Sequence, residues 1–174
     1  MDLGGPRSFF IIKEPIELKQ NGKSVGVYPH SYCKITCTID FDNPVINKQS
    51  YSLVTSDQAF VCEICRARTF GFHEEYEKMK RVGLGRGASL DNVVAIDGNA
   101  VLNPDGLRFP DEFVRHKILD CIGDFSLLGM PILGHIMLNK SSHTFNHAFL
   151  KLFFEQKESW ETRTINDLSD LIPV

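Results

Sequence analysis

The stretch FVRHKILDCIGDFSLLGMP, residues 113–131, predicts a long helix that ends at its final proline. Most of its residues are apolar and are expected to pack on a core. Yet His116, Asp120 and Asp124 recur at every fourth position, with Lys117 beside the first of them. Because each residue turns a helix by about 100°, side chains four apart are offset by only about 40°. The three therefore form one polar stripe on a mostly apolar helix.

On both sides of this helix, hydrophobic patterning and turn residues predict strands and helices that do not alternate strictly. Strands are predicted over 8–13, 16–29, 32–41, 50–55, 92–103 and 132–138, the second and fifth ranges being hairpins that turn at Asn21-Gly22 and Asp97-Gly98. Helices are predicted over 57–70 after Ser56, over 73–82 up to Gly83, and over 143–162 after Ser141 or Ser142. This order predicts an α+β fold, a mostly antiparallel sheet packed on helices as a two-layer sandwich.

The composition is that of one globular domain. The chain has 174 residues, 43% of them hydrophobic and 24% charged, with a net charge of -3. This balance excludes a strongly basic face of the kind that binds nucleic acid or a membrane surface. No apolar run is long enough for stable membrane insertion, and the first ten residues lack a signal-peptide pattern. A cytoplasmic location is the expectation.

The five cysteines are predicted to be buried, inert thiols. Cys33 and Cys37 lie on one strand, where four residues span about 13 Å, so they cannot easily share a metal ion. Cys62 and Cys65 are three apart on a predicted helix and would share a face, which is the spacing of a redox or metal pair. No second close pair completes a zinc cage, so the burial interpretation is favoured.

Residues 83–87, GLGRG, contain glycines like those of a phosphate-binding loop, but the predicted elements around them are in a different order. They follow a predicted helix and precede a strand, the reverse of the order in dinucleotide-binding folds. They also lack the Lys-Ser/Thr pair of a nucleoside-triphosphate loop. A flexible loop is predicted, whose glycines would let a substrate approach the backbone.

The stripe can bind a metal or can be a simple surface ion pair. His116 and Asp120, at i and i+4, can share one metal ion as nitrogen and oxygen ligands, and Asp124 can orient a second imidazole. From spacing alone a surface pair of His116 and Asp120 remains open. The next segment favours the site, because His143 would enter the first turn of a new helix. At that position the helix dipole disfavours a protonated imidazole, whereas a neighbouring carboxylate favours it.

The other histidines are weaker candidates. His135 lies in an apolar strand and is interpreted as a core or edge residue. His147, four residues after His143, is given a structural role. Nothing in the sequence selects His30 or His73.

Several motifs resemble a known family. RARTFGF, GLGRGASLDNVV, VLNPDGLRFPDEFVRHKILDCIGD, LLGMPILGH and KSSHTFNHAFL are similar to the second half of UDP-3-O-acyl-N-acetylglucosamine deacetylases. These are zinc hydrolases at the committed step of lipid A biosynthesis in Gram-negative bacteria. The resemblance runs from about Ser8 to Trp160.

The resemblance implies roles for the stripe. It implies that His116 and Asp120 are two of three protein ligands to zinc. It makes His143 the general acid, or a positive charge near the tetrahedral intermediate, and Asp124 the carboxylate that orients it. It places Lys117 against the sugar-nucleotide part of a UDP-linked acylated glucosamine.

The resemblance also implies substrate contacts and a domain plan. Thr69 would hydrogen-bond near the reacting carbonyl, with Phe70 beside the substrate. Residues 8–174 would form a single domain, with an inserted strand-helix-strand unit at about 73–103 that builds a passage for the fatty acyl chain. The residues expected to line that passage are Leu84, Ser89, Leu90 and Val93.

The family's third zinc ligand and general base come from a Glu-His pair in a first domain. This chain has no Glu-His dipeptide, and His73-Glu74 is the reverse order. The chain is therefore expected to be the acyl-binding half of the deacetylase, with the N-terminal domain as its missing partner and poor turnover alone. Two alternatives stay open: a non-catalytic module that binds an acyl chain or a partner protein, and catalysis within this chain with His147 or His135 as the missing ligand.

Overall fold

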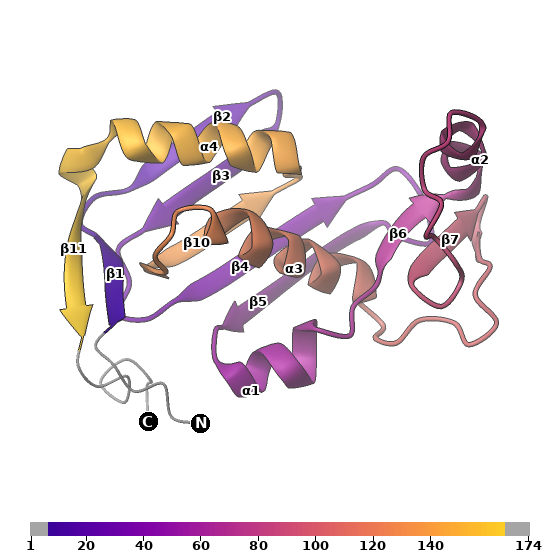
Figure 1. Cartoon of the computed structure of the whole chain (residues 1–174), viewed down its shortest axis with the longest axis horizontal. Helices are drawn as coiled ribbons and strands as arrows, with labels where there is room; N and C mark the ends of the chain where they lie inside the picture. The colour runs from indigo at the N-terminus through magenta and orange to yellow at the C-terminus, as the bar shows by residue number, and fades with distance from the viewer. Residues whose placement is uncertain (1–6, 166–174) are drawn as a thin grey trace.

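The computed structural model describes residues 7–165, which form an α+β fold with helices on one face of a mixed sheet (Figure 1). The predicted fold class is confirmed. The strands are β1 Arg7–Ile12, β2 Ile16–Gln20, β3 Lys23–Tyr28, β4 Lys34–Asp40, β5 Lys48–Val54, β6 Thr69–Phe72, β7 Val93–Asp97, β8 Ala100–Val101, β9 Ile132–Leu133, β10 His135–Asn139 and β11 Trp160–Ile165. The helices are α1 Asp57–Ala59, which continues as a π-helical turn Phe60–Ile64, α2 His73–Arg81, α3 Glu112–Ser126 and α4 His143–Glu155, followed by a 3-10 turn Lys157–Ser159.

The main sheet has five strands in the order β2-β3-β10-β4-β5. Strand β10, late in the sequence, lies at its centre, antiparallel to β3 and parallel to β4. The alternation predicted for β4 is present: Ile35, Cys37 and Ile39 are buried, whereas the residues between them face outward. Thr36 and Thr38 on that outer face hydrogen-bond to serines of β5. One face of the sheet is therefore apolar and the other polar.

Helices α3 and α4 cover the apolar face and contact each other (Figure 1). From α3, Phe113, Ile118 and Cys121 are fully buried beneath the helix. Phe125 of α3 stacks on Phe149 of α4, with ring centroids 5.7 Å apart. Because these apolar residues fix the rotation of α3, the polar stripe is held at the edge of the α3–α4 contact.

Two smaller sheets lie at opposite ends of the molecule (Figure 1). The sheet β11-β1-β9 encloses one end of the core, where Phe10 contacts the stacked rings of Phe153 and Trp160. The sheet β6-β7-β8 carries α2 at the other end. It is a strand-helix-strand unit, and the assignment of 73–103 as the family's insert stays a prediction. Of the predicted domain 8–174, residues 166–174 lie outside the described residues.

The helix predicted to run up to Pro131 ends at Ser126, after which the chain turns and Gly129 takes a positive φ. Three further predicted boundaries are wrong because of strand pairing. The predicted helix 57–70 ends at Ile64, because Thr69–Phe72 pairs in parallel with β7. The predicted strand 132–138 is two strands, since β9 pairs with β1 and β10 with β3 and β4. The predicted helix 143–162 ends at Glu155, because Trp160–Ile165 pairs with β1. In each case long-range strand pairing outweighs local helical or strand propensity.

Gly134 explains the break between β9 and β10. A Cβ atom there would lie 2.8 Å from Ile12 Cγ1 and 2.9 Å from the backbone oxygen of Tyr28. Only glycine allows the chain to pass this close to both neighbours while it changes from one sheet to the other.

The cysteine prediction is correct for two thiols and wrong for two. Cys37 and Cys121 are buried, and burial raises the pKa of Cys37 to about 12. Cys62 and Cys65 are exposed, because the π-helical turn Phe60–Ile64 directs Ile64 into the core and leaves Cys62 and the following Cys65 on the outside. Cys33 is half-buried.

No helix within residues 7–165 combines the length and apolar character needed to cross a membrane. The cytoplasmic location stays a prediction.

Candidate functional site

The stripe on α3 is partly buried rather than on an open surface. The side chains of His116, Asp120 and Asp124 are 14%, 16% and 9% exposed. Nε2 of His116 lies 3.2 Å from Oδ1 of Asp120, as expected for i and i+4 on one helix face. The spacing read from the sequence therefore does bring the two side chains together.

The imidazole of His116 is held on its other side by the backbone. Its Nδ1 lies 3.1 Å from the carbonyl oxygen of Ala67, which can only accept, so Nδ1 carries the proton. This leaves Nε2 to face Asp120. Lys117 donates to Oδ2 of Asp120 at 2.8 Å. Burial by itself would raise the pKa of Asp120, but the hydrogen bonds from His116 and Lys117 outweigh it and lower that pKa to about 2.

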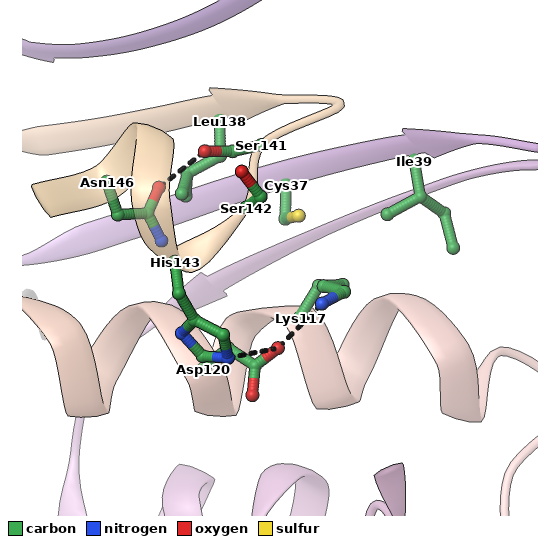
Figure 2. A pocket seen from close by; sticks show the side chains of 9 residues that line it. All are labelled: Cys37, Ile39, Lys117, Asp120, Leu138, Ser141, Ser142, His143 and Asn146. Carbon is green, nitrogen blue, oxygen red and sulfur yellow. Dashed lines mark hydrogen bonds and ion pairs between the residues drawn. The ribbon is translucent and has the colours of Figure 1, made fainter. Parts of the chain in front are cut away.

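His143 joins the stripe from the next helix. It is the first residue of α4, where the Ser142 side chain accepts from the backbone N–H of Phe145 as an N-cap. Its Nδ1 lies 2.9 and 3.0 Å from the two oxygens of Asp124. Its Nε2 lies 3.8 Å from Oδ2 of Asp120. Figure 2 shows the ring reaching from α4 to Asp120, with Lys117 on the other side of the same carboxylate.

Asp124 has two further donors. Asn146, a buried residue, donates to Oδ2 at 2.7 Å, and its own oxygen accepts from Ser141. Nε2 of His147 donates to Oδ1 at 3.2 Å. Asn146 and Ser141 were not among the predicted site residues. The amide four residues after Ser142, on the inner face of α4, is the only sequence signal that could have indicated Asn146.

These side chains surround a small pocket. It is lined by Cys37, Ile39, Lys117, Asp120, Leu138, Ser141, Ser142, His143 and Asn146 (Figure 2). Its volume of about 10 Å³ is close to that of a single water molecule. A ligand of more than a few atoms would therefore lie across the mouth of the pocket and not inside it.

Phe70 reaches the stripe from the small sheet, where Thr69 is its neighbour in β6. Phe70 is half-buried at the start of β6, and its ring centroid is 6.3 Å from that of His116. Nζ of Lys117 lies 5.7 Å from the same ring centroid. Thr69 is exposed beside it. The structure thus places Phe70 next to the stripe, and its contact with a substrate stays a prediction.

The four residues expected to line an acyl passage lie on the small-sheet unit and not in the pocket. They are Leu84, Ser89, Leu90 and Val93. Leu84 and Leu90 are 59% and 45% exposed in the loop between α2 and β7, and Val93 is half-buried. Their role in acyl binding stays a prediction.

Two other histidines lie away from the stripe. His135 is half-buried on β10, with Nε2 2.8 Å from the hydroxyl of Thr36, on the polar side of the main sheet. His30 lies beside it, with ring centroids 5.9 Å apart. Over residues 7–165, no three His, Cys, Asp or Glu side chains are grouped so that they could hold one metal ion. The stripe offers two candidate ligands, His116 and Asp120.

Comparisons with known proteins agree on one family. The sequence model of the LpxC family, UDP-3-O-acyl N-acetylglycosamine deacetylase, matches residues 2–155. The chain is similar to UDP-3-O-acyl-N-acetylglucosamine deacetylases from three bacteria. For Myxococcus xanthus the identity is 46%, over 90% of this chain and 50% of the relative. For Campylobacter fetus it is 42%, over 96% and 57%. For Coxiella burnetii it is 45%, over 95% and 55%.

The chain spans about half the length of these curated relatives. The match nevertheless covers most of the chain and includes α3, the segment after it and the whole of α4. On this basis the chain belongs to the UDP-3-O-acyl N-acetylglycosamine deacetylase family.

Proposed function

We propose that this chain takes part in the zinc-dependent deacetylation of UDP-3-O-acyl-N-acetylglucosamine in lipid A biosynthesis. It would supply the acyl-binding half of the enzyme and part of the zinc site. The observation that carries the proposal is the facing pair of His116 Nε2 and Asp120 Oδ1, 3.2 Å apart, in a member of this family.

The donor set fits a zinc ion. The Ala67 carbonyl accepts from Nδ1 of His116, so Nε2 is the ring nitrogen that faces a carboxylate oxygen of Asp120. Without metal, a proton on Nε2 can bridge these two atoms, as in the hydrogen bond that helps to lower the pKa of Asp120, and a metal cation can take the place of that proton. The low pKa of Asp120, about 2, keeps its oxygens available as ligands at neutral pH. When bound, zinc would polarise the substrate carbonyl and lower the pKa of a bound water to about 7.

The remaining residues can move a proton and hold the substrate. Asp124 accepts from Nδ1 of His143, which fixes the ring and directs Nε2 toward Asp120. From there a protonated His143 can offset the negative charge of the tetrahedral intermediate and protonate the leaving amine. Lys117 presents a positive charge beside the same carboxylate and can meet the diphosphate. Thr69, exposed next to Phe70, can hydrogen-bond the amide.

The site needs further groups for turnover. Catalytic zinc sites in proteins use three protein ligands and one open position, and the stripe provides two. We assign the third ligand and the general base to a first domain, consistent with the chain spanning about half of its relatives. The non-catalytic alternative keeps one supporting observation, the exposed Leu84 and Leu90 of the small-sheet unit.

The test measures acetate release from the acylated sugar nucleotide by the zinc-loaded chain. It is run with the chain alone and with the N-terminal half of a full-length relative added. We expect turnover only after addition, and His116→Ala should remove it. His30→Ala is the matched control, because that histidine lies away from both the stripe and the small-sheet unit, with its ring beside Tyr32.

Zinc affinity is measured in parallel by competition with a chromophoric chelator. Activity of the chain alone would show that it holds a complete site and would contradict the assignment of missing groups. Tight binding of the acylated substrate with no turnover in either mixture would favour the non-catalytic module. Unchanged zinc affinity in His116→Ala would contradict the assignment of His116 as a zinc ligand.

A further inference from the structure

The polar stripe of α3 begins one turn earlier than the predicted site. Glu112 lies four residues before His116, at the first position of α3, and its side chain is fully buried. A buried carboxylate costs several kcal/mol of desolvation unless it is paired and hydrogen-bonded. This one is paired with Arg68, whose side chain is only 6% exposed.

Each oxygen of Glu112 has two donors. Oε1 accepts from the backbone N–H and from Nε of Arg68, both at 2.9 Å. Oε2 accepts from Nη2 of Arg68 at 3.0 Å and from the backbone N–H of Arg108 at 2.6 Å. Burial alone would raise the pKa of Glu112, but these hydrogen bonds outweigh it and lower that pKa. The carboxylate is thus completely satisfied without solvent.

Glu112 hydrogen-bonds the same peptide unit, Ala67–Arg68, that orients the ring of His116. The N–H of Arg68 belongs to the same peptide as the carbonyl of Ala67, and the described residues contain no cis peptide. In a trans peptide the N–H and the C=O point in opposite directions. With the N–H fixed on Glu112, the carbonyl is directed at Nδ1 of His116, 3.1 Å away. Glu112 and His116, four residues apart on α3, therefore bind the two ends of the Ala67–Arg68 peptide, its N–H and its carbonyl.

We infer that the buried Glu112–Arg68 pair is a positioning device for the proposed zinc ligand His116. It aims the Ala67 carbonyl at Nδ1, which fixes the ring and presents Nε2 to the metal. The same hydrogen bonds hold Arg68, the residue before β6 and two residues before Phe70. This inference rests on the proposed function only in naming zinc as the ligand of Nε2. The orientation of the ring by the Ala67 carbonyl does not depend on that function.

The test compares Glu112→Gln with the matched control Asp111→Asn in the full 174-residue chain. Asp111 is the neighbouring residue and also pairs with an arginine, Arg115, at 2.5 Å, and within residues 7–165 its carboxylate is hydrogen-bonded to that arginine and not to the Ala67 peptide. The first readout is spectroscopic: the Nδ1–H proton of His116, measured by nitrogen-proton NMR without added metal. The second is zinc affinity by chelator competition.

We expect the Nδ1–H signal to be protected from exchange in wild type and in Asp111→Asn, and to exchange with water in Glu112→Gln. Zinc affinity should fall by about 10- to 100-fold in Glu112→Gln alone, the loss typical of residues that support a metal ligand. Should Glu112→Gln fail to fold, Arg68→Lys takes its place. That variant keeps the positive charge and the backbone bonds to Glu112 but removes the planar fork, and it should show a smaller change in both readouts.

A folded Glu112→Gln chain with the wild-type Nδ1–H signal and wild-type zinc affinity would overturn the inference. The proposed function fails by a different result, wild-type zinc affinity in His116→Ala. In that case the NMR signal alone still decides whether Glu112 orients the ring.

Discussion

Replacement of Asp120 by Asn should lower stability in a pH-dependent way, even without metal. The pKa of Asp120 is lowered from 3.8 to about 2 by its partners His116 and Lys117, despite partial burial. A carboxylate with a lowered folded-state pKa stabilises the protein above its unfolded-state pKa, and that contribution is lost as pH falls through the folded-state value. A lowering of about 1.8 in pKa corresponds to about 2 kcal/mol.

The full difference between wild type and Asp120→Asn should therefore be seen at pH 7, and about half of it should be lost by pH 3. The assay is urea unfolding followed by circular dichroism at several pH values, with a chelator present so that no metal contributes. Asp42→Asn is the matched control, because Asp42 is exposed in the loop after β4. A penalty for Asp120→Asn that is the same at pH 7 and pH 3, or no penalty at either, would refute the reasoning.

Packing and exposure lead to three other predictions, two on stability and one on the labelling of thiols. Gly134→Ala should destabilise by about 1–3 kcal/mol, because its Cβ would lie 2.8 Å from a β1 side chain and 2.9 Å from a backbone oxygen; a change below 0.5 kcal/mol in urea unfolding would contradict this close approach. Asn146→Ala should cost about 1.5–3 kcal/mol, since Asp124 would lose a buried donor at 2.7 Å, and wild-type thermal stability would argue against that bond. A thiol reagent should label Cys62 and Cys65 in the native chain and the buried thiols only after unfolding, as mass spectrometry can show.

Local sequence patterns predicted much of the fold and the composition of the stripe. The apolar periodicity over residues 113–131 predicted α3, although the helix ends five residues before Pro131, at Ser126. Asn21-Gly22 predicted a hairpin turn that has positive φ at both residues. The i, i+4 spacing predicted that His116 and Asp120 share a face. Family motifs extended these predictions to His143, which the structure places on Asp124. Such features depend on a few neighbouring residues or on short motifs, so they can be recognised in a single sequence.

The tertiary structure decided what depends on segments distant in the sequence. A seven-residue apolar run became two strands because each half pairs with a different sheet, and the end of a predicted helix became β11 because β1 accepts it as a partner. The hydrogen bond from the backbone N–H of Arg68 to Glu112 joins residues 44 apart in the sequence, and no local pattern predicts it. Strand pairing and buried ion pairs are selected by the whole packed core, whose energy no short window of sequence contains. Thus the sequence determined which groups line the stripe, whereas the packed structure decided how each group is held.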